Sequence, residues 1–198
     1  MTVAQQRRER GRPRDEGIDA AVRAAAWELL SEAGYDGMSF EAVARRAGCS
    51  RAALYRRYRG KAEFVRSLMY DNSREFEPRL PPEAAPREVL IAHLQTYVRL
   101  MAGAGGGVSL ALAQGRRRDP ELTPALKSLY EGEADYYARA LRAAVADLTD
   151  AFDPTLVIDS LLGAVMFRVV MLQGALAPEE IEALADQAIA FARSLASR

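Results

Sequence analysis

The chain has 198 residues, 49% of them apolar, which is enough for a single core or for a small domain beside a larger one. Its single cysteine, Cys49, excludes an intramolecular disulfide and fits a reducing cytoplasm. The formal net charge of zero hides a division: residues 1–61 carry 13 basic and 8 acidic side chains, and residues 62–198 carry 14 and 19. Only the N-terminal third therefore suits a polyanion such as DNA.

The N-terminus is arginine-rich and polar, without the apolar run of a secretory signal. The most apolar segment, 156–172, is interrupted by Asp159, Ser160 and Arg168, so it predicts a buried helix and not a membrane span. We expect a cytoplasmic protein that makes no membrane contact.

Residues 1–14 form a polar arm without hydrophobic periodicity, and they contain the run RGRPR at 10–14. Proline favours an extended chain, and arginines on an extended chain suit a narrow, A·T-rich minor groove. The arm could equally be a basic tail that adds only nonspecific attraction, so both interpretations stay open. Arg12 and Arg14 are its candidate DNA contacts.

A first helix is expected over about 15–33, with apolar residues on one face and Gly34 at its end. Residues 39–61 then predict two short helices and a tight turn, with seven basic side chains and one acidic side chain. Gly48 can take the positive φ of the turn, and Leu54 anchors the second helix. Together these features favour a helix-turn-helix that binds nucleic acid.

Other residues of this segment lie at fixed spacing and match a known pattern. They are Gly34-Tyr35, Ser39, Val43-Ala44, Ala47-Gly48-Cys49-Ser50, Leu54-Tyr55, Tyr58 and Lys61. Over residues 17–65 the chain resembles the TetR family of bacterial transcriptional regulators. The resemblance implies an all-α fold, in which a small DNA-binding domain precedes a larger domain that dimerises and binds an effector.

The second helix of the motif, 51–58, has the position of a recognition helix. Arg51 lies in its first turn and can make bidentate contacts to guanine, and Arg56 can reach a base or a phosphate. The resemblance implies that Tyr55 contacts DNA and that Ser50, Arg57 and Lys61 contact the backbone. Two alanines depart from the pattern at 52 and 53, which removes a hydroxyl or amide contact at 53. The candidate DNA contacts of this segment are Ser39, Ser50, Arg51, Ala52, Tyr55, Arg56, Arg57 and Lys61.

The remaining chain predicts further helices and no strands. The fourth helix runs from about 61 to 76 and is followed by prolines at 78, 81, 82 and 86. Later helices are expected at about 87–102, 107–117, 120–147, 154–173 and 178–196. Residues 103–107 are glycine-rich and predict a flexible connection, because they lack the Lys-Ser/Thr of a phosphate loop. Asp119 and Asp153, each before a proline, predict helix N-caps. The predicted organisation is an arm at 1–14, a DNA-binding domain at 15–61 and a larger helical domain at 62–198.

The helix predicted at 154–173 is apolar on nearly all sides, so it must be buried all round. We expect one side to face its own core and another to face a second subunit, with 178–196 beside it. The predicted interface of a homodimer is therefore 154–196, and the alternative is that both helices complete a monomer core.

Aromatic and methionine side chains on several helices suit an apolar ligand pocket, although an ordinary core uses the same residues. The pocket is implied mainly by the family resemblance. The candidate ligand-binding residues are Tyr97, Met101, Leu126, Tyr130, Tyr137, Met166, Phe167 and Met171.

Catalysis finds little support, because His93 is the only histidine. The acids at 131, 133 and 135 favour a solvated helix face over a metal site. The sequence therefore predicts no catalytic residue, metal or cofactor. It predicts a homodimeric repressor that a small, largely apolar effector releases from a double-stranded DNA operator. The alternatives are an all-α ligand-binding or enzymatic protein without operator-specific DNA binding, and a nonspecific DNA-coating protein.

Overall fold

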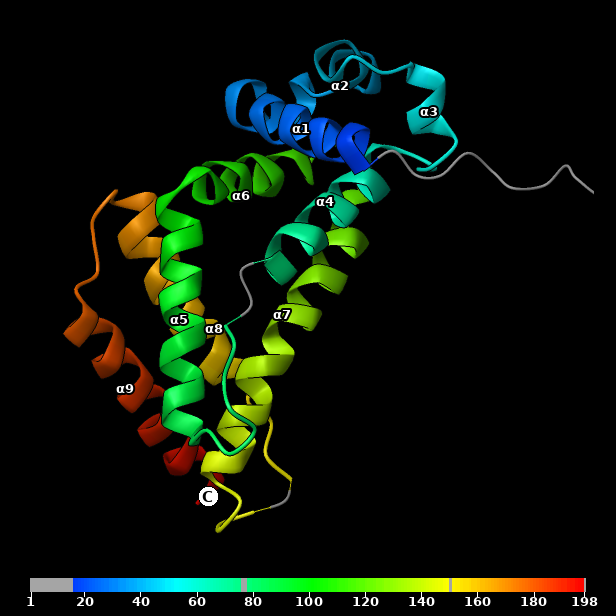
Figure 1. Ribbon diagram of the computed structural model, residues 1–198. Helices are drawn as coiled ribbons and strands as arrows, with labels where there is room; N and C mark the ends of the chain where they lie inside the picture. The colour runs from blue at the N-terminus through cyan, green and yellow to red at the C-terminus, as the bar shows by residue number, and fades with distance from the viewer. Residues whose placement is uncertain (1–15, 76–77, 150, 198) are drawn as a thin grey trace, which may run out of the picture.

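The computed structural model describes residues 16–75, 78–149 and 151–197 (Figure 1). Residues 1–14, with the candidate contacts Arg12 and Arg14, lie outside the described residues. Every regular element of the described residues is helical, which confirms the all-α prediction. The elements are α1 (Glu16–Gly37), α2 (Phe40–Ala47), α3 (Arg51–Tyr55), α4 (Lys61–Glu75), α5 (Pro86–Ala102), α6 (Ala104–Gly115), α7 (Leu122–Ala144), α8 (Thr155–Val165), the π-helix η1 (Met166–Met171) and α9 (Pro178–Ala196).

The helices form two connected bodies. Figure 1 shows α1, α2 and α3 at one end of the molecule, α4 and α7 running away from them, and α5, α8 and α9 in the other body. The N-terminal core holds buried residues of α1 to α4 together with Val108, Leu112 and Leu122 of α6 and α7. Phe64 and Val65 of α4 are among its most buried side chains. The core therefore extends past the boundary that the sequence predicts after residue 61.

The regular part of α1 ends where the sequence predicts. Gly34 has φ 67° and ψ −174°, a backbone conformation that interrupts the helix and suits a residue without a Cβ. Tyr35, which follows it, is only 2% exposed. The interruption thus turns Tyr35 into the N-terminal core.

The glycine-rich stretch 103–107 is a correction to the sequence analysis. Most of it belongs to the first turn of α6 and is not a flexible connection. A Cβ at Gly105 would lie 2.5 Å from the carbonyl oxygen of Leu100, and one at Gly106 would lie 2.3 Å from that of Met101. These glycines therefore allow α6 to fold back closely on the end of α5.

The helices predicted at 120–147 and 154–173 also differ from prediction. The helix α7 begins at Leu122, two residues after the predicted start, so its N-cap is Glu121 and not Asp119. Asp119 instead accepts a hydrogen bond of 3.1 Å from the backbone of Glu121. Asp153 accepts a 3.0 Å bond from the backbone of Thr155 at the start of α8. The long helix predicted at 154–173 is divided, because its last turns form η1. Pro178 begins α9 as predicted.

No helix within residues 16–75, 78–149 and 151–197 combines the length and the apolar character that crossing a bilayer requires.

Candidate nucleic-acid interface

The helix-turn-helix is held by the local signals that the sequence contains. Ser39 accepts a 3.1 Å hydrogen bond from the backbone of Ala42, and Ser50 accepts one of 3.3 Å from Ala53, so both serines cap helices. Gly48 takes φ 66° and ψ 28° at the end of α2. Leu54 is 1% exposed and fixes α3 on the core. The geometry predicted for 39–55 is confirmed.

Aromatic side chains pack between α3 and the N-terminal core. The Phe40 ring lies 4.9 Å from the Tyr55 ring in an edge-on arrangement, and 5.6 Å from the Phe64 ring. Tyr58 packs 4.7 Å from Phe64, as expected for a core position. It lies beyond α3, because this helix ends at Tyr55 and not near 58. Tyr55 remains 59% exposed, so one edge of its ring is supported and the rest faces outward.

Four predicted DNA contacts share the exposed surface of α3 and its C-terminal turn: Arg51, Ala52, Tyr55 and Arg56. The Arg51 guanidinium lies 5.8 Å from the centre of the Tyr55 ring and 3.6 Å from a carboxylate oxygen of Glu41. Arg56 forms no ion pair with the described residues. Arg51, the first residue of α3, and Tyr55, its last, therefore form a cation–π pair on the exposed side of the helix.

The other predicted contacts within 39–61 form hydrogen bonds or ion pairs inside the protein. The hydroxyls of Ser39 and Ser50 serve as caps. Arg57 forms an ion pair with Asp19 of α1. The ammonium of Lys61 donates hydrogen bonds to the carbonyl oxygens of Tyr35, at 2.7 Å, and Met38, at 3.2 Å. Arg46 of α2, which is not among the predicted contacts, pairs with Glu32 at 2.9 Å.

Sequence reasoning missed a polar contact behind this interface. The Tyr35 hydroxyl donates a 2.5 Å hydrogen bond to Asp119, which lies 84 residues away between α6 and α7. Burial and this hydrogen bond raise the pKa of Tyr35 well above its ordinary value. Both residues had local signals, as a family-pattern tyrosine and a predicted cap, but nothing local indicates that they meet.

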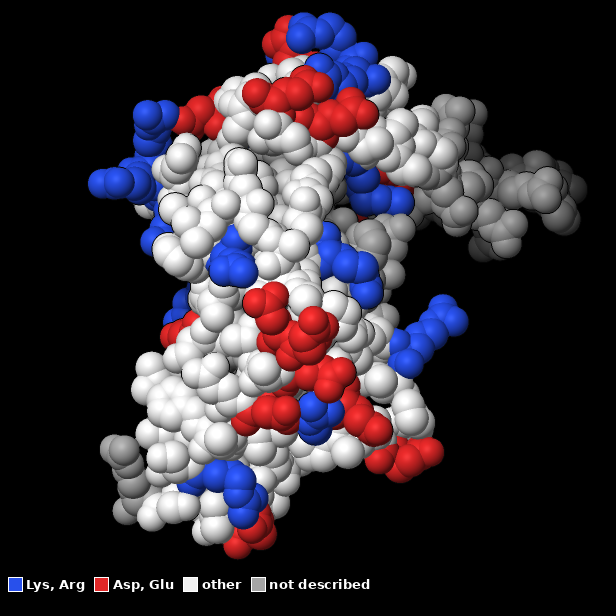
Figure 2. Space-filling model, turned by 90° about the vertical axis from the view of Figure 1, so that its left-hand side faces the viewer, with Lys and Arg blue, Asp and Glu red and all other residues white. Residues whose placement is uncertain are grey.

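Charge is divided along the molecule as the sequence indicates. Figure 2 shows acidic side chains gathered over the lower half of one face, on the C-terminal body, while basic and acidic groups mix at the top. Glu182 and Asp186 of α9, in the C-terminal body, are both paired with Arg87. This region is unsuited to a polyanion.

The predicted ligand-binding residues do not share one environment. Tyr97, Met101 and Tyr137 belong to the C-terminal core, whereas Leu126 packs against the N-terminal core. Tyr130 is 37% exposed and hydrogen-bonds Asp159, and burial together with this bond raises its pKa to about 12. Met166 is half-buried, and Phe167 and Met171 are each 60% exposed. A pocket built from all eight stays a prediction.

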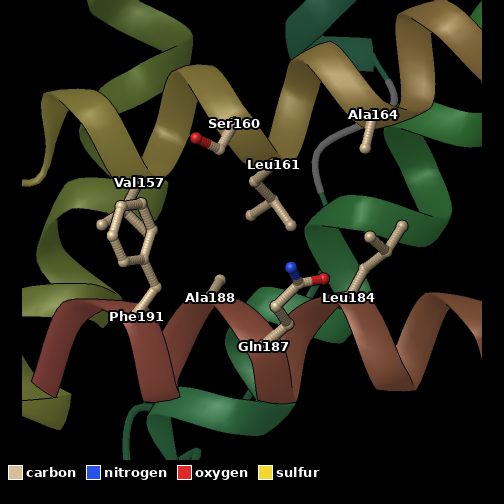
Figure 3. A pocket seen from close by; sticks show the side chains of 8 residues that line it. All are labelled: Val157, Ser160, Leu161, Ala164, Leu184, Gln187, Ala188 and Phe191. Atoms are coloured by element: carbon tan, nitrogen blue, oxygen red, sulfur yellow. The ribbon is translucent and has the colours of Figure 1, made fainter. Parts of the chain in front are cut away.

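A groove lies between α8 and α9, and its lining contains none of the eight predicted ligand-binding residues. Figure 3 shows side chains of both helices facing one another across it. The space is about 340 Å³ including its open side, and its lining is Val157, Ser160, Leu161, Ala164, Leu184, Gln187, Ala188 and Phe191. Its walls are mainly apolar, with Ser160 and Gln187 as the polar groups.

Within the described part of the chain, no three His, Cys, Asp or Glu residues lie together in a way that could hold a metal ion. His93 stacks on Tyr136 with ring centres 4.7 Å apart.

Comparison with known proteins agrees with this arrangement. The family model described as "Bacterial regulatory proteins, tetR family" matches residues 22–68, and that described as "Tetracyclin repressor-like, C-terminal domain" matches residues 80–188. The chain is 25% identical over 165 residues to the uncharacterized HTH-type transcriptional regulator YdeS of Bacillus subtilis (strain 168), covering 82% of this chain and 83% of YdeS.

Solved structures share the fold. The regulator FadR from Bacillus subtilis, in complex with stearoyl-CoA, superposes with a TM-score of 0.66 at 18% identity, covering 89% of this chain and 98% of FadR. The fatty acid degradation regulator FadR from Bacillus halodurans gives 0.65 at 16% identity, over 93% and 97%. With family models that match both bodies, the chain belongs to the TetR family of DNA-binding transcription regulators.

Proposed function

We propose that this protein is a homodimeric repressor that binds a near-palindromic operator through two copies of α3. The observation that carries the proposal is the exposed pair of Arg51, the first residue of α3, and Tyr55, its last, whose guanidinium and ring centre lie 5.8 Å apart. A guanidinium at the N-terminal end of a recognition helix can read guanine by two hydrogen bonds. Arg56, exposed one residue beyond α3, adds a free positive charge at the same surface.

The Glu41 carboxylate favours operator-specific DNA binding over nonspecific DNA binding. It lies 3.6 Å from Arg51 and holds a negative charge near the reading surface. A competing acid lowers attraction to DNA in general, because nonspecific binding rests on phosphate contacts. Base contacts must then supply the rest of the affinity, which favours an operator-specific regulator over a DNA-coating protein.

The outer face of α8 and η1 supports a homodimer. The inner face, including Val157, Leu161 and Val165, is buried in the protein's own core. The outer face still exposes Leu156 at 57%, Phe167 at 60% and Met171 at 60%. Apolar side chains that recur along one face of a helix mark an interaction surface. A second copy of α8 and α9 would cover this face and the groove of Figure 3.

Control by a small effector is the finer part of the proposal. The C-terminal body contains aromatic and methionine side chains such as Tyr97 and Met101, and flexible apolar side chains can line a pocket for an apolar molecule. The stearoyl-CoA in the B. subtilis FadR structure places a long acyl chain in a protein of the same fold. Acyl-CoA esters and other largely apolar molecules are therefore the first effectors to test.

The deciding experiment is selection of bound duplexes from a random DNA pool by the 198-residue chain, followed by mobility-shift titration. We expect two half-sites related by a dyad, and unrelated DNA at moderate salt should fail to compete. An enriched pool without a consensus, or equal competition by unrelated DNA, would leave a nonspecific binder. No binding at all would favour the alternative, an all-α ligand-binding or enzymatic protein.

A further inference from the structure

Lys61 occupies an unusual place for a lysine, because it is the first residue of α4. The N-terminus of a helix carries partial positive charge, so a cation there is disfavoured unless other groups compensate. The compensation comes from the end of α1. The ammonium lies 2.7 Å from the Tyr35 carbonyl oxygen, 3.2 Å from that of Met38 and 4.0 Å from the centre of the Tyr35 ring.

These three contacts are enough to occupy the three N–H donors of the Lys61 ammonium. An ammonium has three N–H donors and no acceptor. Two carbonyl oxygens and the face of an aromatic ring are therefore enough to occupy it. Lys61 is also half-buried, and this burial lowers its pKa, against the opposing effects of Asp36 and Asp119. A phosphate would have to compete with partners that are already in place.

Tyr35 is held at its other end as well. Its hydroxyl donates to Asp119, whose second carboxylate oxygen accepts from the backbone of Glu121 at 3.1 Å. The ring is packed between these contacts and Gly115 of α6. Beside it, Arg118 forms an ion pair with Asp36. One tyrosine thus connects the start of α4, the end of α1 and the junction of α6 with α7.

We propose that Lys61, Tyr35 and Asp119 form a positioning clamp that sets the helix-turn-helix on the larger body, and that Lys61 promotes operator binding through this clamp and not by contacting phosphate. The inference rests on the proposed function, since it concerns the same operator. Two linked readers bind well only when each is held at the half-site spacing. When the clamp is loosened, the helix-turn-helix must be ordered during operator binding. The free-energy cost of this ordering then lowers operator affinity.

The test compares Lys61→Met with Asp119→Asn and with the double variant, by operator titration over a range of salt concentrations. A lost phosphate contact in each subunit would reduce the salt slope of the dimer by about two. The clamp predicts a loss of operator affinity of about tenfold with an unchanged slope. It also predicts that the double variant loses less than the product of the single losses, because both changes disable one device.

Arg66→Met is the matched control. Arg66 lies on the same helix and is exposed, so this variant removes one positive charge from α4 without touching the clamp. We expect its operator affinity to stay close to that of the unaltered protein. A slope reduced by about two in Lys61→Met, with losses that multiply in the double variant, would make Lys61 a phosphate ligand and overturn the clamp. Unaltered affinity in Lys61→Met would overturn it too.

Circular dichroism checks that each variant folds. If Lys61→Met does not fold, Tyr35→Phe, which removes only the hydroxyl, and Asp119→Asn decide the matter. Reduced affinity at unchanged slope in both supports the clamp, and unaltered affinity in both overturns it. A failure of the proposed function has a different signature, because then the unaltered protein itself shows no operator preference.

Discussion

Gly115 of α6 lies directly against Tyr35 of α1: a Cβ at position 115 would come within 2.7 Å of Cδ1 and 2.8 Å of Cβ of the tyrosine. Tyr35 is buried, and the Asp119 hydrogen bond fixes its far end. The ring therefore cannot swing aside without breaking a polar contact. Absence of a side chain at 115 is what lets α6 approach the end of α1 closely.

Gly115→Ala should consequently destabilise the protein. Overpacking of a tight contact costs about 1–3 kcal/mol, more than the gain from replacing glycine in a helix, which is about 0.5–1 kcal/mol. Gly107→Ala is the control, because Gly107 lies on the same helix and a Cβ there meets nothing within 4 Å. Denaturant unfolding should show a loss for the first variant and a small gain for the second. Equal stability of the two variants would contradict the close contact.

The ion pair between α5 and α9 makes stability depend on acid pH. Arg87 bonds Asp186 through Nε at 2.6 Å and Nη2 at 3.0 Å. These hydrogen bonds lower the pKa of Asp186, against an opposing effect of burial. A depressed folded pKa contributes stability that is complete above the unfolded value, about 3.9, and is lost as the pH falls through the folded value.

Asp186→Asn should therefore lower the melting temperature at pH 7, and the difference from the unaltered protein should shrink as the pH falls below the ordinary aspartate pKa and through the lowered folded pKa of Asp186. Asp135→Asn serves as control, since Asp135 pairs along its own helix with Arg139 at 3.3 Å. Melting curves recorded from pH 2.5 to 7 would check both variants. A difference for Asp186→Asn that persisted unchanged at the lowest pH would rule out the ion pair as its source.

The helix-turn-helix could be predicted from sequence because its signals are local. A serine cap acts within three residues, as at Ser39 and Ser50, and the backbone conformation of Gly48 depends on its immediate neighbours. The exposed position of Arg51 at the start of α3 follows from the same spacing. These features need no knowledge of the rest of the chain.

Tertiary packing decided what the sequence left open. Gly105 and Gly106 indicate a flexible stretch when read locally, yet they pack against α5 backbone and belong to α6. The pairing of Tyr35 with Asp119 spans 84 residues, so no local pattern encodes it. Lys61 matches a family position for DNA contact, but its ammonium direction depends on where α1 ends. The division of 154–173 into α8 and η1 likewise has no local signal that we could identify.

Arg51 should carry base preference if α3 reads the operator. Arg51→Ala is expected to cost about 1–3 kcal/mol on the operator and to relax the preference at one base pair in each half-site. Arg139→Ala, on α7, removes a charge far from this surface and should change neither quantity. Footprinting and titration on single-base operator variants would measure both effects. Unchanged base preference in Arg51→Ala would mean that other residues, and not Arg51, read the bases of the operator.

The outer face of α8 should tolerate no large charge if it forms the dimer interface. Gly163 is exposed and a Cβ there meets nothing within 4 Å of its own chain, so Gly163→Glu should fold as a monomer. In a dimer the same change would bury an unpaired carboxylate. Operator affinity should fall with dimer affinity, because two linked half-sites bind far better than one.

Sedimentation of the protein at micromolar concentration would check the assembly. Gly132→Glu, at an equally open glycine of α7, should leave it a dimer. An unaltered protein that sediments as a monomer at this concentration would refute the interface.

Effector control should follow from the connection between the two bodies. A molecule bound among the helices of the C-terminal body can release the operator only if it prefers the DNA-free shape, and the operator must then weaken its binding by the same factor. A coupling of about 1–3 kcal/mol would reduce operator affinity 5- to 150-fold. We expect a small, largely apolar molecule to raise the melting temperature and to dissociate the complex.

A thermal-shift screen of acyl-CoA esters of different chain length and other apolar compounds would find it, and titration into the protein–operator complex would measure the coupling. Compounds that raise the melting temperature yet leave operator affinity unchanged would reject induction, while the DNA-binding surface built on α3 would stand independently of that outcome.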